Sequence, residues 1–103
     1  MPLKITKRPL AEEDIIDHWI YIAKDNPIAA DAVCDAIEET FQNLAEMPLM
    51  GTTHVTNKSE LSSVRMFPVS GFKNYLILYI PSDETLEIVR VIRKRRSIKN
   101  IFP

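Results

Sequence analysis

Glycine and cysteine are both scarce in this sequence of 103 residues, which contains two glycines and one cysteine. A phosphate-binding loop needs several glycines close together, so a nucleotide site of that kind is excluded. The single cysteine, Cys34, cannot form an internal disulfide, and neither histidine lies at metal-ligand spacing from it. We therefore expect no metal site and no cofactor.

Long hydrophobic runs are also missing. No apolar stretch is long enough to span a bilayer, and Met1–Lys4 lacks the hydrophobic segment of a secretory signal. A lone cysteine and no export signal predict a cytoplasmic protein without membrane contact. The length, with 46% hydrophobic residues, suits a single domain over residues 1–103 with one core.

The net charge of −1 conceals a polarised distribution. Residues 1–46 carry four Lys/Arg and ten Asp/Glu, a formal charge of −6, whereas residues 47–103 carry nine and four, a formal charge of +5. An anionic partner would meet the local potential near the carboxyl terminus, where six of the 13 cations gather. They are Arg90, Arg93, Lys94, Arg95, Arg96 and Lys99.

Three short runs rich in β-branched and aromatic residues predict strands at Val64–Val69, Tyr75–Ile80 and Leu86–Ile92. The breaks at 70–74 and 81–84 contain glycine, proline and aspartate, which favour chain reversal. Because these connections are too short for parallel crossovers, the strands should form an antiparallel meander. The middle run has no polar alternation, so it should be the central strand, covered on both faces.

Strict alternation along the last strand places Arg90 on the same face as the apolar residues at 86, 88 and 92, opposite Val91 and Arg93. A guanidinium in such surroundings needs a partner. Two interpretations remain open: an internal ion pair with a helix carboxylate, or a role in contacting a partner. Arg65, on the neighbouring strand, converges with it only if the strand register allows.

Amino-terminal to this meander, the alternating run Leu3–Thr6 can add a strand at its edge. A helix should begin near Pro9, and a second should run from Pro27 to about Glu46, capped by the polar residues before it. The short break between them predicts an antiparallel helical hairpin. For the first helix, spacing predicts a buried face and a solvent face. The residues assigned to the buried face are Ile15, Ile16, Trp19, Ile20, Ile22 and Ala23, and those assigned to solvent are Asp14, Asp17, His18, Tyr21 and Asp25.

The expected fold is therefore α+β, with an antiparallel four-stranded sheet and an amino-terminal helical hairpin packed on one face, in the order β-α-α-β-β-β. The other face of the sheet must be closed by the carboxyl-terminal tail or a partner, or remain an open groove. Residues 52–60 form a polar connection of unusual length. The cation run Arg93–Arg96 is either a solvated strand exit or a docking site for an anion or acidic surface. The absence of interleaved aromatic residues argues against a base-stacking platform.

Several segments, in this order and spacing, resemble the RelE/ParE superfamily of bacterial type II toxins, on its ParE side. They are Tyr21–Ala23, Asp25–Pro27, Leu44–Gly51, Val64–Val69 and Glu87–Ile92, so the resemblance covers nearly the whole chain. It implies a small cytoplasmic plasmid-stabilisation toxin that forms a hetero-oligomer with a cognate ParD-like antitoxin. ParE-like members poison DNA gyrase, whereas RelE-like members cleave messenger RNA on the ribosome.

One departure from the family pattern concerns the segment after the last strand, where histidine, two spacers, arginine and aspartate are common. Here the segment reads Arg93, Lys94, Arg95, Arg96 and Ser97, so only Arg96 matches. Arginine is a poor proton acceptor, because it stays charged.

We therefore predict a ParE-like toxin that inhibits DNA gyrase by binding and carries no catalytic residue. The contact surface would include Arg65, Arg90, Arg93 and Arg96.

Two alternatives remain. One is a ribosome-dependent messenger RNA endoribonuclease in which two of these arginines, at 65 and 90, clamp phosphate, with a proton carrier from the long loop: His54, Lys58 or Glu60. The other is an inactive remnant that only binds antitoxin.

Overall fold

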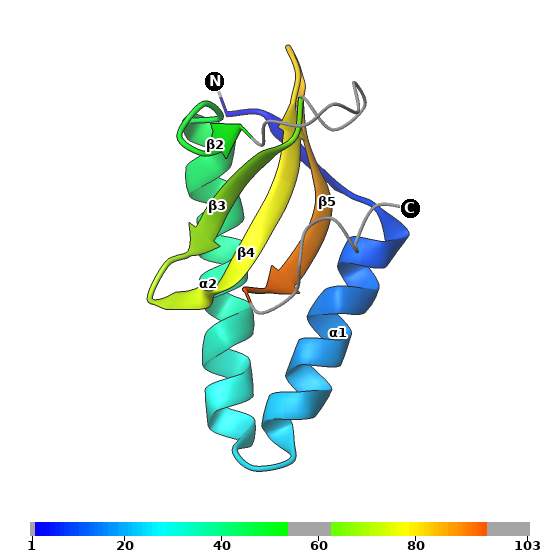
Figure 1. Ribbon diagram of the computed structural model, residues 1–103, viewed down its shortest axis with the longest axis vertical. Helices are drawn as coiled ribbons and strands as arrows, with labels where there is room; N and C mark the ends of the chain where they lie inside the picture. The colour runs from blue at the N-terminus through cyan, green and yellow to red at the C-terminus, as the bar shows by residue number, and fades with distance from the viewer. Residues whose placement is uncertain (1, 54–62, 95–103) are drawn as a thin grey trace.

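A computed structural model describes residues 2–53 and 63–94 of the chain (Figure 1). The helical hairpin packs behind a twisted sheet, whose strands run across the front of the view in Figure 1. Arg96 and the loop residues His54, Lys58 and Glu60 lie outside the described residues. The elements in chain order are β1 (Lys4–Lys7), α1 (Pro9–Ala23), α2 (Pro27–Glu46), β2 (Thr52–Thr53), β3 (Arg65–Val69), β4 (Phe72–Pro81) and β5 (Thr85–Arg93).

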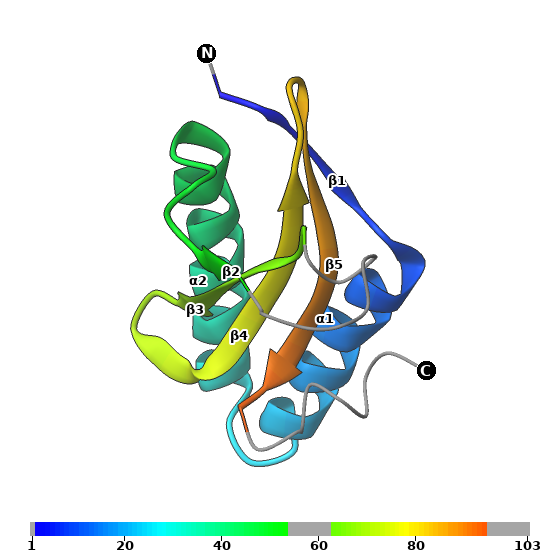
Figure 2. The same ribbon diagram turned by 45° about the horizontal axis from the view of Figure 1, so that its top comes forward.

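The sheet has five strands in the order β1-β5-β4-β3-β2, and it is mixed. The antiparallel meander of β3, β4 and β5 is confirmed. The prediction of four antiparallel strands is wrong, because β1 runs parallel to β5, with Ile5 opposite Leu86, and β2 adds a fifth strand (Figure 2). The helical hairpin is a connection long enough to allow a parallel pairing. The two residues of β2 are too few to show any alternation.

β4 is the central strand, as predicted, and apolar residues pack on both of its faces. On the helix side, Ile77 and Tyr79 are fully buried with Phe41 of α2. On the opposite side lies a second apolar cluster whose members are at most 3% exposed. The cluster consists of Val64, Leu78, Val89 and Ile92. Because these four side chains are covered, this face of the sheet is not an open groove at their positions.

A β-bulge interrupts β5, so the predicted alternation is wrong beyond its first half. Leu78 pairs with Arg90 while the next residue, Tyr79, pairs with Ile88, which leaves Val89 as the extra residue. An inserted residue of this kind shifts the side-chain alternation that follows it. As a result, Val91 packs in the helix-side cluster together with Ile88. Strict alternation places these two residues on opposite faces of the strand.

α1 is rotated relative to the prediction. Ile16, Trp19 and Ile20, expected inside, are 57%, 40% and 49% exposed. Asp14 and His18, expected in solvent, are instead partly buried toward β5. Two polar residues occupy the inner face because β5 has unpaired backbone groups there, as described in the next section.

α2 follows its predicted pattern closely. It begins after Asn26, whose side-chain oxygen accepts a hydrogen bond from the Ala29 N–H at 3.1 Å, and Pro27 occupies the first turn. Its buried face includes Ile37, Phe41 and Leu44. Within the described part of the chain, neither helix is long and apolar enough to cross a membrane.

Candidate functional site

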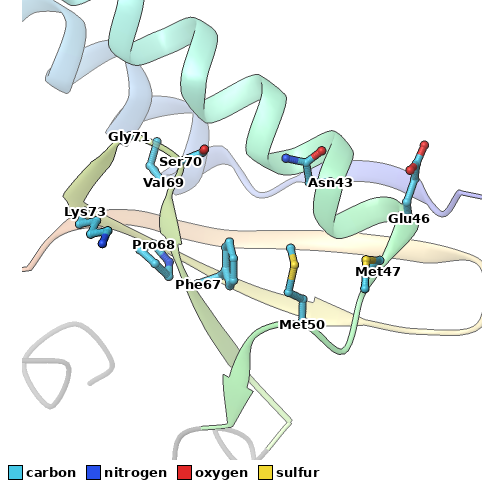
Figure 3. A pocket seen from close by; sticks show the side chains of 10 residues that line it. All are labelled: Asn43, Glu46, Met47, Met50, Phe67, Pro68, Val69, Ser70, Gly71 and Lys73. Atoms are coloured by element: carbon cyan, nitrogen blue, oxygen red, sulfur yellow. The ribbon is translucent and has the colours of Figure 1, made fainter.

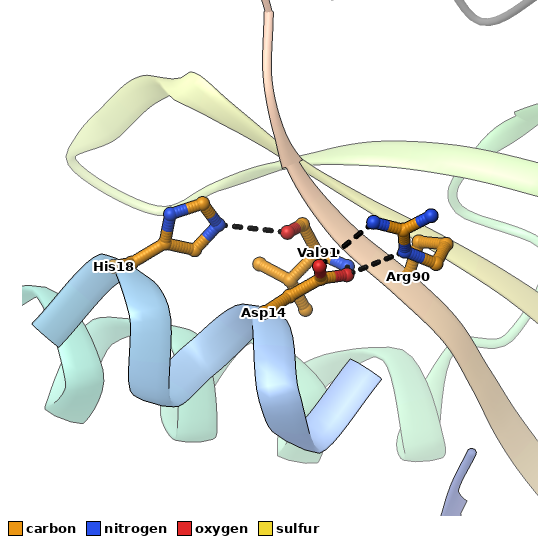
Figure 4. A network of polar contacts seen from close by, with 4 residues as sticks. All are labelled: Asp14, His18, Arg90 and Val91. Atoms are coloured by element: carbon orange, nitrogen blue, oxygen red, sulfur yellow. Dashed lines mark hydrogen bonds and ion pairs between the residues drawn. The ribbon is translucent and has the colours of Figure 1, made fainter. Parts of the chain in front are cut away.

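The seam between α1 and β5 is held by polar side chains that reach the outer edge of the strand (Figure 4). β1 ends opposite Ile88, so no strand of the described segments lies beside the rest of this edge. The Asp14 Oδ2 accepts a hydrogen bond from the Val91 N–H at 3.0 Å, and the His18 Nε2–H donates to the Val91 carbonyl at 2.7 Å. Two residues one helical turn apart thus satisfy both backbone groups that a neighbouring strand would have paired.

Arg90 completes this seam. Its Nε and Nη2 donate to the two oxygens of Asp14 at 2.7 and 2.8 Å, and both side chains are only 12–13% exposed. These hydrogen bonds raise the pKa of Arg90 above its usual value. Of the two interpretations left open for Arg90, the structure contains the internal ion pair, so its charge is largely neutralised within the protein.

Arg65 is also engaged internally. Its Nη1 donates to the Gly51 carbonyl at 2.7 Å, next to the buried Tyr79. The Tyr79 hydroxyl donates to the Pro48 carbonyl and accepts from the Gly51 N–H, both at 2.8 Å. Burial raises the pKa of Tyr79, although the Gly51 hydrogen bond and nearby Arg65 lower it. Arg65 therefore fixes the segment that leaves α2.

The two arginines are not brought into one clamp. Arg90 is bound to α1, which packs along β5, whereas Arg65 is bound to the segment entering β2, at the opposite edge of the sheet. The sequence left open whether Arg65 and Arg90 converge on one face. In the structure their guanidinium groups bind different elements and do not form one site.

Arg93 lies in a different environment, at the end of β5. Its guanidinium carbon is 5.1 Å from the centre of the Tyr21 ring, and Tyr21 is 59% exposed. Among the described residues, Arg93 has no carboxylate partner. Of the predicted site residues that the structure describes, Arg93 is the one that binds neither a carboxylate nor a backbone carbonyl within the described part of the chain.

A groove between the end of α2 and β3 was not anticipated from the sequence (Figure 3). It encloses about 410 Å³, and most of its lining is apolar. The apolar residues are Met47, Met50, Phe67, Pro68 and Val69, the residues with polar side chains are Asn43, Glu46, Ser70 and Lys73, and Gly71 completes the lining. Met47 is 63% exposed. The only sequence signal was a pair of methionines after a helix.

Cys34 has the environment of a structural thiol. Burial raises its pKa, and the neighbouring carboxylates of Asp31, Asp35 and Glu38 raise it further. A thiol that resists ionisation is a weak nucleophile, so Cys34 is suited to packing and not to catalysis.

The sequence of this chain matches one known protein family, and its fold matches a solved structure. Residues 5–98 match the model for the ParE toxin of type II toxin–antitoxin systems, parDE. No match is found among curated proteins. A solved structure described as a chromosomal ParDE toxin–antitoxin system from P. aeruginosa is 15% identical, with a TM-score of 0.69 over 88% of this chain and 95% of that one. That likeness supports the fold, and the match of the family model over nearly the whole sequence shows that this chain belongs to the ParE toxin family of type II toxin–antitoxin systems.

Proposed function

We propose that this chain inhibits DNA gyrase by binding it, and that a cognate ParD-like antitoxin neutralises it in a cytoplasmic hetero-oligomer. Membership of the ParE toxin family supports this proposal. On the proposed contact surface, Arg93 and Arg96 supply charge to the partner. Arg65 and Arg90 hold the scaffold that presents that surface.

The observation that carries the choice between gyrase binding and ribonuclease activity is the internal engagement of Arg65 and Arg90. A ribonuclease site needs cations that hold phosphate next to a proton donor and acceptor. Here Arg90 is paired with Asp14, and Arg65 is bound to the Gly51 carbonyl. A phosphate would therefore compete with Asp14 for Arg90, and with the Gly51 carbonyl for the Nη1 of Arg65.

We expect the purified chain to inhibit supercoiling by purified gyrase, and to leave ribosome-bound messenger RNA intact at the same concentration. The measurement is the relaxation state of plasmid DNA against toxin concentration, with an excess of cognate antitoxin as the control that restores supercoiling. Normal supercoiling at high toxin excess, together with cleavage of the message, would instead establish the ribonuclease. Normal supercoiling, an intact message and unaffected cell growth would indicate the inactive remnant.

The groove at the end of α2 is the surface we propose for an apolar segment of the antitoxin. Exposure of a lining dominated by methionine, phenylalanine and valine to water is unfavourable, so covering it with an apolar segment lowers the free energy. Methionine side chains adapt to the shape of a partner. Lys73 and Glu46 provide charges of both signs among its lining residues, which would orient a segment carrying complementary charges.

Met47→Glu should weaken antitoxin binding by roughly 10- to 100-fold, because it buries a charge in an apolar contact. Leu49→Glu is the matched control: Leu49 is 69% exposed, lies two residues away and does not line the groove. Its effect should stay within about threefold. Titration calorimetry measures both affinities, and gyrase inhibition by the free toxin should be unchanged in both variants. Equal losses for the two variants would place the antitoxin elsewhere.

A further inference from the structure

Tyr21 and Arg93 form a surface pair that the sequence did not predict. The sequence assigns Tyr21 only to the solvent face of its helix, and it assigns Arg93 to the contact surface without a neighbour on α1. In the structure the guanidinium carbon lies 5.1 Å from the ring centre, so a cation rests on an exposed aromatic face. The two residues are 72 positions apart and meet only because α1 packs along β5.

The position of Arg93 relative to α1 is fixed by the seam described above. Asp14 and His18 bind the two backbone groups of Val91, two residues before Arg93. Immediately after it, the Lys94 N–H donates to the Asn74 carbonyl at 2.6 Å. The strand end is thus held on both sides of Arg93, and its guanidinium is presented in a defined place.

This pair contributes little to the core. Tyr21 is 59% exposed and lies away from the buried side of α1, where Ala11, Ile15 and Ile22 face the interior. A cation stacked on an exposed ring is a weak interaction for stability. However, tyrosine and arginine are the residue types enriched in the energetic centres of protein interfaces. Restricting them before binding lowers the entropy cost of association.

The charges around the pair favour a carboxylate on a protein as its ligand. A cation–π contact of this kind uses no hydrogen-bond donor of the guanidinium, so its N–H groups remain able to donate to an acceptor, and carboxylates fit two of them with parallel hydrogen bonds. Lys94 adds a second cation. On α1 the nearby residues Glu13 and Asp17 are acidic and exposed, which disfavours the dense phosphate of a nucleic acid.

We propose that Tyr21 and Arg93 form a preorganised recognition pair that binds a carboxylate on an acidic surface of the protein target. The inference rests on the proposed function only in identifying that target as gyrase.

The test uses growth arrest after induced expression, because that readout does not depend on which target is correct. Tyr21→Ala and Arg93→Gln should each raise the toxin level needed for arrest by about tenfold, and Arg93→Glu by more. Tyr21→Phe keeps the ring and should remain within about twofold of wild type. Ile16→Ala is the matched control: Ile16 is 57% exposed, lies on α1 and is far from β5. It should have no effect.

Parallel measurements separate the possible causes. Unchanged affinity for the antitoxin shows that the variants are folded, and inhibition of purified gyrase identifies the target. If the variants lose growth arrest but wild-type protein never inhibits gyrase, the pair is supported and the proposed target is wrong. Arrest as strong as wild type in the Tyr21→Ala and Arg93→Gln variants would overturn the inference, as would a wild-type chain that leaves growth unaffected. Binding of a single-stranded oligonucleotide that is lost in Tyr21→Ala would overturn the carboxylate assignment.

Discussion

Asp14→Ala should lower the free energy of unfolding by about 3 kcal/mol, because it removes the partner of a mostly buried cation. The substitution leaves Arg90, whose side chain is 13% exposed, without its two carboxylate hydrogen bonds. It also leaves the Val91 N–H on an unpaired strand edge without an acceptor. The loss is measurable by urea denaturation followed by circular dichroism, and in a protein of this size it corresponds to a fall in Tm of roughly 10–20 °C.

Two variants test the origin of this loss. Asp17→Ala removes another acid from α1, but Asp17 is exposed, so its effect should stay within about 0.5 kcal/mol. Adding Arg90→Ala to Asp14→Ala should cost less than the sum of the single substitutions, because the buried charge disappears with its partner. Additive losses would show that the ion pair is not what holds α1 against β5.

Two features of the fold could not be predicted from the sequence: the pairing of the edge strands β1 and β2, and the face that α1 turns toward the sheet. The bounds of α2 and the central place of β4 were predicted correctly, because one has a helical stripe and the other a continuous apolar run. The bounds of β4 were predicted too short, since the strand begins at Phe72, inside the break expected at 70–74. The pattern of α1 was misleading, since apolar residues at 16 and 20 are exposed while Asp14 and His18 face the protein. Periodicity assumes that polar residues face water, and here they serve the open edge of β5.

The candidate site was predictable only in part, for a related reason. The sequence identified Arg90 as an arginine that needs a partner, but the choice between Asp14 and an external ligand depends on the rotation of α1. The bulge at Val89 has no sequence signature, yet it decides which residues follow on each face of β5. The meeting of Tyr21 with Arg93 is a consequence of both features, so it could not be read from either segment alone.

Gly51→Ala should be about as destabilising, roughly 2–4 kcal/mol, because there is no room for a methyl group at this position. A Cβ on Gly51 would overlap the Tyr79 hydroxyl and lie 2.8 Å from the Met66 carbonyl oxygen. Tyr79 is fully buried and cannot move aside without losing its bonds to Pro48 and Gly51. Urea denaturation measures the loss, and an unfolding free energy within about 0.5 kcal/mol of wild type would contradict the close approach.

The cost of Gly51→Ala should fall when the Tyr79 hydroxyl is absent. Tyr79→Phe alone leaves the buried Gly51 N–H without its acceptor, and we expect a loss of about 1–3 kcal/mol. In that background the added methyl no longer meets the hydroxyl, so the double variant should be more stable than additivity predicts, although the Met66 carbonyl and the ring carbon Cε1 at position 79 still restrict the methyl. Gly71 offers a contrast, because nothing lies within 4 Å of its missing side chain and its requirement is a φ of +79°. Gly71→Asn, a residue that adopts this left-handed conformation, should therefore cost less than Gly51→Asn. Gly51 has no positive φ, so a Gly71→Asn variant that costs as much as Gly51→Asn would contradict the lack of space at position 51.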